Sequence, residues 1–428
     1  MALTKEKLPK QTTSTWLDSM TSTARSPWRN RKLWSLAIAE TLSWAGLFYV
    51  FPALLLKWHE WFQWGIAELS IGFTLALIAS AKIGMIAGRI IDSGNSQKLM
   101  PLSVIIGALL LSLLPMVTML WQFYLVWLLI GCCLAGCLYD PCFSYITRTF
   151  QADAKNSIIM ITLIAGFAST ISYPLCTLIT DLYDWKTTIY LLTVILCFIA
   201  GPLFWYGTSI EPAGWHSSDK DNKTSVAKVV KPALYSPVFW GLLMTFAAFS
   251  SNQGMIVSQI FPLLESREIS SGMTVFFASC IGPMQVVARL ILFATETFGN
   301  RDIPILGVCL ASLICLCLSS LALAVGGTSL ILVVLFVIFQ GGPYGLFSIV
   351  RPVITAEMLG RVNFGLLSSM VMMGSLWGSA FAPGIAGSIA DRWNYDTVLI
   401  TTSSIAAFGV IILMVTSTLQ RKSPFNLG

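Results

Sequence analysis

Long apolar stretches alternate with short polar segments along the whole chain, and this alternation predicts its secondary structure. Each apolar stretch is near the roughly 20 residues that an α-helix needs to cross the hydrocarbon core of a bilayer. We therefore predict an all-α polytopic membrane protein. The twelve predicted spans cover residues 33–57, 67–91, 99–120, 122–147, 155–180, 187–207, 236–262, 272–295, 303–325, 329–350, 362–387 and 396–418.

One polar connection is longer than the others and divides the spans into six plus six. It covers residues 208–235 and follows the sixth predicted span. The predicted organisation is an N-terminal tail, a six-helix bundle, a linker, a second six-helix bundle and a C-terminal tail. These parts cover residues 1–32, 33–207, 208–235, 236–418 and 419–428.

Short motifs of the first half return in the second half in the same order. FPALL at 51–55 is matched by FPLL at 261–264, FSYITR at 143–148 by FSIVR at 347–351, and DLYDWKT at 181–187 by DRWNYDT at 391–397. A shared order and a similar offset indicate an internal repeat. Parallel six-helix repeats that place a substrate site between them are one known architecture of membrane transporters.

Composition and charge agree with this class and set the orientation. The chain is 56% hydrophobic and 11% charged, with a mean hydropathy of +0.76, which does not fit soluble domains. With the N-terminus inside, nineteen lysines and arginines fall in inside segments and four outside, which predicts cytoplasmic termini. The net charge of +6 is then a topology signal, and no nucleic-acid partner is expected.

The sequence contains no pattern that predicts an enzyme, a metal site or a cofactor. The ten cysteines lie within predicted spans without metal-binding spacing, and we interpret them as apolar packing residues. Residues 1–32 lack the apolar core of a cleavable signal peptide. Short loops favour a bacterial inner-membrane location, and we expect a monomer.

The loop after the second predicted span resembles the signature loop of the major facilitator superfamily. It contains Gly88, Arg89 and Asp92, followed by Gly94 and Lys98. The resemblance implies the major facilitator fold, alternating access and a gate in which the loop carboxylate locks the two halves. The predicted gating residues are Arg89, Asp92, Arg148 and Arg351.

The loop also departs from the family pattern. Ser93 stands where a basic residue usually follows the aspartate, and Leu292 replaces the acid in the second-half counterpart. The lock is therefore expected to be weaker than in other members.

Ionisable residues within spans are costly and mark function by default. At about 1.5 Å per residue, Glu40, Lys82 and Asp140 each lie about 10 Å from the inner side, so they could form one cluster. The functional interpretation is that Asp140 or Glu40 carries a proton that drives transport. The alternative is that Lys82 forms a structural pair with one acid or extends to the interface.

The run from Gln285 to Arg289 resembles the eighth helix of monocarboxylate porters, a branch of the superfamily. In that branch D-x-x-A-R supplies an arginine for the substrate carboxylate, and Arg289 matches it. Further resemblance lies in W-x-x-A-E-L-S at 64–70, Y-D-P at 139–141 and I-V-R at 349–351. Gln285 replaces the family's aspartate, and Ala53 stands where animal members have a proton-accepting lysine. In the repeat Arg289 aligns with Arg89, which equally favours a packing or gating role.

The seventh span carries polar residues that could line a cavity. Asn252 and Gln259 would share one helix face, and we predict that they bind substrate together with Tyr139, Gln285 and Arg289. The alternative is that they form hydrogen bonds between helices.

These patterns favour a secondary active transporter for a small organic anion, preferentially a carboxylate, with protons as the coupling ion. One alternative is efflux of a larger amphipathic compound such as a drug or a siderophore. A further alternative is a receptor that kept the fold and lost transport.

Overall fold

A computed structural model describes residues 27–150, 153–209, 232–298, 304–326, 329–360 and 364–422. Within these ranges every regular element is a helix. Most of the predicted linker and of both predicted tails lies outside the described residues. All ten cysteines are free, and no cluster of metal-ligating side chains occurs in the described ranges.

The first half contains six membrane-crossing segments, most of which are interrupted. The interruptions fall at a π-helical turn, at glycines or beside proline, where a helix loses regular hydrogen bonds. The elements are α2 (Arg31–Ser43), η2 (Trp44–Phe48), α3 (Val50–Phe62), α4 (Ile66–Asp92), α5 (Ser96–Leu111), η3 (Leu114–Met116), α6 (Leu120–Cys137), α7 (Tyr139–Phe150), α8 (Ala154–Ala165), α9 (Ala168–Leu182), α10 (Trp185–Ile195), η5 (Leu196–Ala200) and α11 (Gly201–Gly207).

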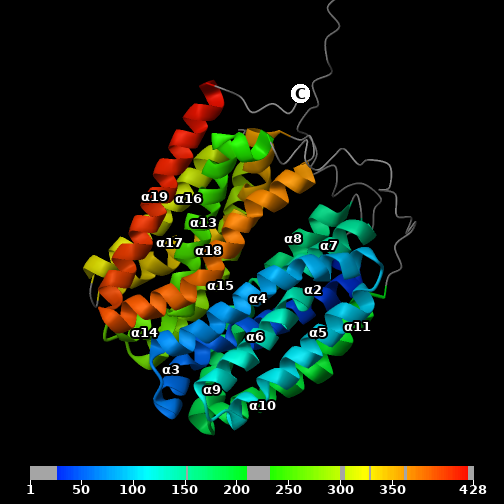
Figure 1. The fold of residues 1–428 in the computed structure, drawn as a ribbon, viewed down its shortest axis with the longest axis vertical. Helices are drawn as coiled ribbons and strands as arrows, with labels where there is room; N and C mark the ends of the chain where they lie inside the picture. Colours follow the sequence, from blue (N-terminus) through cyan, green and yellow to red (C-terminus); the bar gives the residue numbers. More distant parts are fainter. Residues whose placement is uncertain are drawn as a thin grey trace, which may run out of the picture.

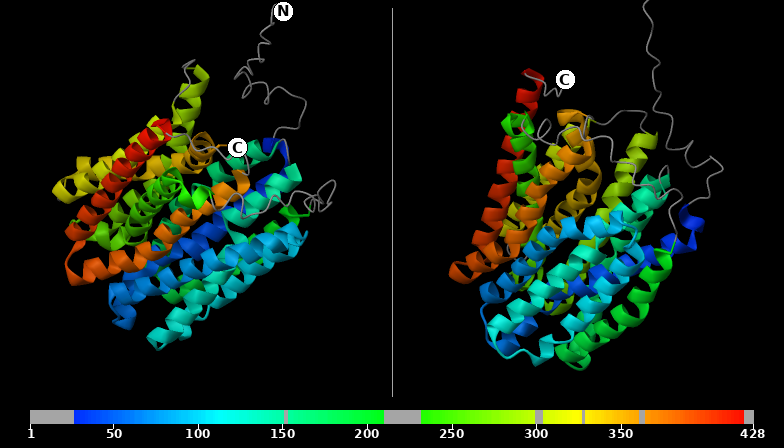
Figure 2. Two further views of the ribbon diagram at one scale, coloured as in Figure 1. Left: turned by 45° about the horizontal axis from the view of Figure 1, so that its top comes forward. Right: turned by 45° about the vertical axis from the view of Figure 1, so that its right-hand side comes forward.

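The second half consists mainly of longer helices. Its elements are α13 (Pro237–Ser258), α14 (Ile260–Glu265), α15 (Ser271–Phe298), α16 (Ile305–Gly326), α17 (Leu330–Leu359), α18 (Phe364–Arg392) and α19 (Tyr395–Lys422). Figure 1 shows the two halves as two groups of helices, the first coloured blue to green and the second green to red. Figure 2 shows the same two groups from two other directions.

Ten of the twelve predicted spans are helical segments long and apolar enough to cross a membrane. The two others correspond to α13 with α14, and to α18. The two helices α13 and α18 pack closely against each other. Their polar groups bond across this contact, as the Ser250 and Ser375 hydroxyls do, and Ser251 Oγ donates to Gly378 O at 3.2 Å. Polar and small residues are common where membrane helices face protein.

The two halves meet closely along α4 with α18 and along α9 with α15. A Cβ on Gly387 would lie 2.8 Å from Ser70 Oγ, and one on Gly282 would lie 2.5 Å from Gly166 O. The N–H of Gly384, which follows Pro383, donates to Thr74 Oγ1 at 2.8 Å. We call the end that contains the start of α4 and the end of α18 the closed end.

At the opposite end of α4, two glycines are not covered by another helix of the described ranges. A Cβ on Gly84 or on Gly88 would meet no atom within 4 Å. The two halves are therefore packed together at the closed end, whereas α4 has open space around Gly84 and Gly88 at its other end, which we call the open end.

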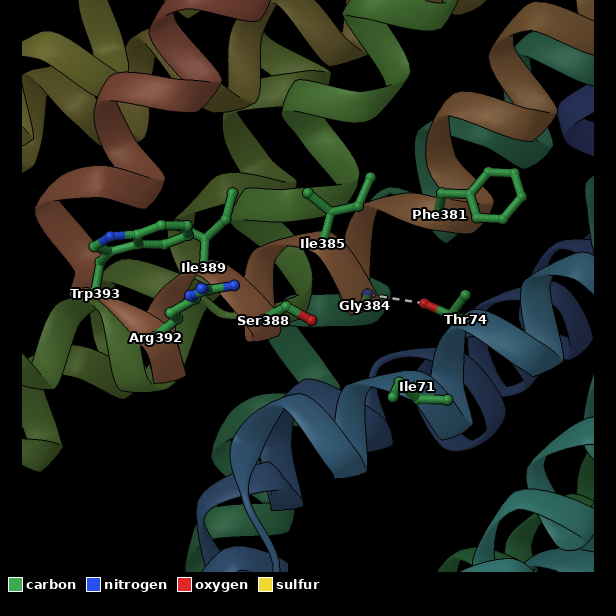
Figure 3. A pocket seen from close by; sticks show the side chains of 9 residues that line it. All are labelled: Ile71, Thr74, Phe381, Gly384, Ile385, Ser388, Ile389, Arg392 and Trp393. Atoms are coloured by element: carbon green, nitrogen blue, oxygen red, sulfur yellow. Dashed lines mark hydrogen bonds between the residues drawn. The ribbon is translucent and has the colours of Figure 1, made fainter.

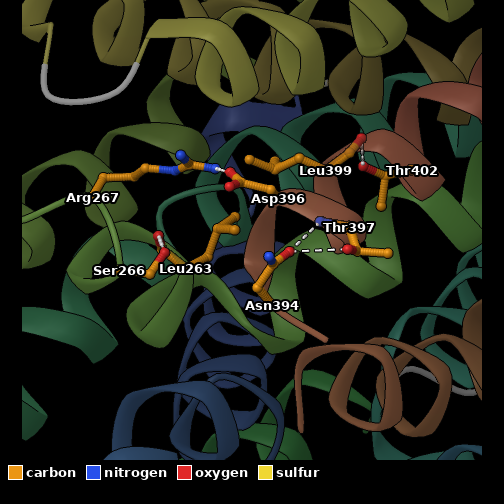
Figure 4. A network of polar contacts seen from close by, with 8 residues as sticks. All are labelled: Leu263, Ser266, Arg267, Asn394, Asp396, Thr397, Leu399 and Thr402. Carbon is orange, nitrogen blue, oxygen red and sulfur yellow. Dashed lines mark hydrogen bonds and ion pairs between the residues drawn. The ribbon is translucent and has the colours of Figure 1, made fainter. Parts of the chain in front are cut away.

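Two of the repeated sequence motifs form the same local structure. Asp184 caps α10 by accepting from Thr187 N–H at 2.6 Å, and Asn394 caps α19 by accepting from Thr397 N–H at 2.9 Å. Figure 4 shows the second cap beside the ion pair between Arg267 and Asp396. Asp184 and Thr187 hold the same motif positions in 181–187 as Asn394 and Thr397 hold in 391–397, so the repeat extends to the capping hydrogen bonds.

Candidate functional site

Glu40 is completely buried in α2 and has no conventional partner. Both carboxyl oxygens lack a hydrogen bond of standard geometry, and so does the neighbouring Trp44 indole nitrogen. The Cys142 thiol and Asp140 of α7 lie on its other side. The helix changes to a π-helical turn four residues after Glu40, at Trp44–Phe48, and such turns are frequent at functional sites.

Tyr139 and Asp140 lie where the fourth span breaks. Leu138 leaves helical geometry, with φ −98° and ψ −164°, and α7 begins at Tyr139. Pro141 lacks an N–H and is tolerated in this first turn, where a carboxylate is also favoured by the helix dipole. The Tyr139 ring lies 4.8 Å from the Trp44 ring, centroid to centroid.

Arg289 of α15 binds two backbone carbonyls, one from each half. Its Nε donates to Gly345 O on α17 at 2.8 Å, and its Nη1 donates to Thr162 O on α8 at 2.9 Å. Thr162 lies in the last turn of α8, where carbonyl groups carry the negative end of the helix dipole. A guanidinium has five N–H donors, so three remain beyond these two bonds.

Close packing of α17 on α15 makes the Gly345 carbonyl reachable. A Cβ on Gly345 would lie 2.2 Å from Gln285 O, and one on Gly341 would lie 2.6 Å from Ile281 O. Only glycine fits at this separation. The glycines of α17 therefore allow the close approach that brings the Gly345 carbonyl to Arg289.

Asp140 and Arg351 face each other across the two halves. They interact electrostatically, yet they form no ion pair within 4.0 Å among the described residues. Asp140 is exposed to solvent, whereas Arg351 is half-buried.

Three tyrosines complete the arrangement. Tyr49, Tyr139 and Tyr344 all interact electrostatically with Arg289, and Tyr49 also contacts the Gln285 side chain. We call this group the central site. Its members are Glu40, Trp44, Tyr49, Tyr139, Asp140, Gln285, Arg289, Tyr344 and Arg351.

The sequence predicts that Lys82 lies close to Glu40 and Asp140. Lys82 is exposed on α4, whereas Glu40 has no exposed surface. The cation that faces Asp140 is Arg351, which comes from the other half. Asp140 interacts electrostatically with Glu40 and with Arg351, and the predicted grouping of Lys82 with the two acids stays a prediction.

The predicted gate lies near the open end. Arg89 is exposed near the end of α4, and Arg148 is exposed near the end of α7. The side chain of Asp92 lies outside the described residues, so the pair of Asp92 with Arg148 stays a prediction. Arg351 belongs to the central site by position.

Asn252 and Gln259 do not belong to the central site. Asn252 is fully buried within the second half, where it donates to Thr402 O at 2.9 Å and accepts from Gln340 Nε2 at 3.1 Å. Gln259 lies at the break between α13 and α14 and donates to Ser70 Oγ at 2.8 Å, which joins the halves at the closed end. The second of the two sequence interpretations, bonding between helices, describes both residues.

The residues of the site that sequence reasoning missed include Tyr344 and Thr162. Tyr344 follows the Gly341, Gly342 and Pro343 run within α17, which marks a close helix contact in the sequence. Thr162 contributes a backbone carbonyl, and no side-chain pattern could have revealed it.

Comparison with known proteins places the chain in a family. The Major Facilitator Superfamily profile matches residues 33–336. The chain belongs to this superfamily. A comparison with curated protein sequences gave no match.

Solved structures of superfamily transporters resemble this fold. A variant of the nucleoside transporter NupG aligns with a TM-score of 0.72 and 14% identity over 90% of this chain and 100% of its own. A bacterial homologue of the human lysosomal transporter Spinster, inward-facing and occupied, gives 0.70 and 15% over 94% and 99%. A variant of the peptide transporter POT with alafosfalin gives 0.66 and 15% over 91% and 94%.

These likenesses establish the fold. At such low identity they do not define a substrate, and they carry no information on the monocarboxylate branch. That assignment stays a prediction.

Proposed function

We propose that this protein is a secondary active transporter that moves a small organic anion, preferentially a carboxylate, by alternating access. The observation that carries the proposal is the pair Arg289 and Arg351. Both project from the second half toward the first, and neither forms an ion pair with a carboxylate within 4.0 Å among the described residues.

The charge balance of the central site favours an anion. Buried charges are costly unless they are paired, and Arg289 and Arg351 supply two positive charges opposite the single accessible carboxylate of Asp140. A substrate carboxylate would supply the missing negative charge. A guanidinium suits this task because it stays charged and can hold a carboxylate with two parallel hydrogen bonds.

Binding to Arg289 would be linked to movement of the halves. Its bond to Thr162 O joins the second half to the first, and a substrate that attracts the guanidinium competes with this carbonyl. A ligand shifts a conformational equilibrium only through such differential contacts. The two interpretations of Arg289, as a substrate ligand and as a gating residue, thereby become one mechanism.

Proton coupling is assigned to Glu40 together with Asp140. Glu40 interacts electrostatically with Asp140, and both its carboxyl oxygens lack a hydrogen bond of standard geometry. A buried carboxylate that is poorly paired is costly unless a proton or a cation accompanies it. Protonation of Glu40 in step with substrate binding would keep the site close to neutral. Protons are thus the proposed coupling ion.

The orientation belongs to the same proposal. With both termini cytoplasmic in a bacterial inner membrane, the closed end faces outward and the open end faces the cytoplasm. The conformation is then inward-facing, the state in which Asp140 is reached from the cytoplasm. A monomer is sufficient, because both halves of the site come from one chain.

Efflux of a larger amphipathic compound is the second candidate. Three aromatic side chains pack in a row beside Asp140. The Tyr139 ring centroid lies 4.8 Å from that of Trp44 and 5.0 Å from that of Phe143. Such a row could accept an aromatic or extended substrate.

The decisive experiment is thermal stabilisation of the purified protein by a ligand panel. The panel contains short monocarboxylates, dicarboxylates, amino acids, nucleosides, dipeptides, siderophores and lipophilic cations. A ligand of the folded state present at about 100 times its Kd stabilises by about 2.7 kcal/mol. Wild type is compared with Arg289→Gln and Arg351→Gln, and with Lys98→Gln as a control that removes an exposed cation.

We expect carboxylates to stabilise the wild type and the Lys98→Gln control but neither arginine variant. Stabilisation by lipophilic cations alone would replace the anion proposal with efflux. An unchanged carboxylate response in both arginine variants would remove Arg289 and Arg351 from the site.

A further inference from the structure

A groove of about 370 Å³ runs along the seam between the two halves at the closed end. Figure 3 shows Arg392 and Trp393 at one end of the row of side chains and Phe381 at the other. One wall comes from α4 and the other from α18. The lining residues are Ile71, Thr74, Phe381, Gly384, Ile385, Ser388, Ile389, Arg392 and Trp393.

The body of the groove is apolar and open to the outside. Ile71, Phe381 and Ile385 are 38%, 45% and 48% exposed. In a superfamily member these helices stand in a bilayer, so such side chains face lipid chains. The polar atoms deeper in the groove are engaged, since Thr74 Oγ1 accepts from Gly384 N–H.

The length of the groove matches one leaflet of the bilayer. From Phe381 to Trp393, α18 rises about 18 Å at about 1.5 Å per residue. The hydrocarbon core of a bilayer is about 30 Å thick, so one leaflet contributes about 15 Å. An acyl chain that entered the groove would therefore reach from its headgroup to the middle of the membrane.

A cationic side chain lies at the end of the groove formed by Arg392 and Trp393. Arg392 is exposed and lies 5.3 Å from the Trp393 ring centroid, and it forms no ion pair in the described part of the chain. The adjacent carboxylate of Asp391 is already engaged by the Ala67 N–H. Tryptophan and arginine are typical of the membrane–water boundary, where anionic headgroups meet protein.

We propose that this groove binds one phospholipid with an anionic headgroup, whose phosphate contacts Arg392 and whose acyl chain lies between α4 and α18. Because the two walls belong to different halves, the complete site exists only while the closed end is closed. Bound lipid therefore stabilises this conformation. The proposal rests on membership of the superfamily and does not depend on the identity of the substrate.

The test is lipid retention by the purified full-length protein in native mass spectrometry, with phosphatidylglycerol and phosphatidylcholine as probes. Wild type is compared with Arg392→Gln and with the control Lys186→Gln. Lys186 is a matched cation that lies 4.1 Å from the Trp61 ring centroid, outside the groove. We expect Arg392→Gln to weaken phosphatidylglycerol binding about fivefold and the control to leave it unchanged. Equal loss in both variants, or equal retention of the two lipids by the wild type, would overturn the assignment to Arg392.

A second variant tests the acyl-chain part. Ser388→Phe fills the groove and keeps Arg392, and Ser404→Phe places the same ring on an exposed face of α19. Ser388→Phe should reduce retention of phosphatidylglycerol and lower the gain in melting temperature that this lipid produces, whereas Ser404→Phe should do neither. If both phenylalanine variants retain lipid like the wild type, the groove is not the binding site.

Discussion

The carboxylate of Asp391 accepts a hydrogen bond from the backbone N–H of Ala67 at 2.8 Å. Asp391 lies in the last turn of α18 and Ala67 in the first turn of α4, so this bond joins the second half to the first. The first N–H groups of a helix have no partner within it, and its N-terminus favours a negative charge. A Cβ on Gly65 would lie 2.9 Å from the Asp391 carboxylate, so glycine leaves room for the contact.

Asp391→Ala should open the closed end more often. Loss of a capping carboxylate costs about 1–2 kcal/mol, which changes a two-state population by about 5- to 30-fold. Hydrogen exchange followed by mass spectrometry should show faster exchange in the peptide covering 66–74. The matched control is Asp181→Ala, which changes the equivalent position of the first-half motif. Equal exchange in wild type and Asp391→Ala would mean that other contacts keep the end closed.

Removing the charge of Asp140 should tighten anion binding and slow transport. In Asp140→Asn the substrate no longer competes with a carboxylate for Arg351, and release becomes slower. We expect several-fold tighter binding by calorimetry, since coupling between residues of one charge network is worth about 0.5–3 kcal/mol, together with reduced counterflow in vesicles. Weaker binding by Asp140→Asn would show that Asp140 contacts the substrate directly.

Glu40→Gln should separate substrate exchange from proton-driven accumulation. The amide has the shape of the protonated carboxyl, and it removes a buried charge that costs several kcal/mol when it lacks a partner. Exchange of substrate across proteoliposomes should persist, while accumulation driven by a pH gradient should be lost. Glu40→Ala serves as the contrast, because the cavity it leaves should lower the melting temperature. Full accumulation in Glu40→Gln would exclude this residue as the proton carrier.

Gly345→Ala should destabilise the protein and impair the site together. The added Cβ would lie 2.2 Å from Gln285 O, so α17 must move away from α15, at a cost of about 1–3 kcal/mol. Arg289 then loses its bond to Gly345 O. Gly272→Ala is the control, because no atom lies within 4 Å of a Cβ there. The melting temperature should fall only in Gly345→Ala. Similar melting temperatures for both variants would show that the helices can separate easily.

The cap of α10 should respond to acid. Hydrogen bonds from the Thr187 side chain and backbone N–H hold the pKa of Asp184 below its usual range. The folded-state pKa is the lower one, so the stabilisation is present above the unfolded pKa of about 3.9 and is lost as pH falls through the folded pKa. Asp184→Asn should remove this part of the acid sensitivity of the melting temperature, and the effect should be small because the residue is exposed. An unchanged acid profile in Asp184→Asn would show that the cap contributes nothing.

The sequence by itself determined the class of protein, the helical segments and the internal repeat. These features depend on local composition, since about 20 apolar residues in a bilayer must form a helix to satisfy their backbone groups. Even the caps at Asp184 and Asn394 follow from motifs a few residues long. The two arginines that we assign to the site were visible for the same reason, as ionisable residues within or at the ends of apolar spans.

Only the tertiary structure decided which residues meet. The electrostatic interaction of Asp140 with Arg351 could not be predicted from spacing, because the partner comes from a helix more than 200 positions away in the sequence. Asn252 was predicted to line a cavity, but it is buried and forms hydrogen bonds with two other helices. The period of a helix shows which residues share a face but not which neighbour covers that face. The contacts of Arg289 with backbone carbonyls were also out of reach, since every residue has a carbonyl and only the packing of α17 and α8 brings those of Gly345 and Thr162 to the guanidinium.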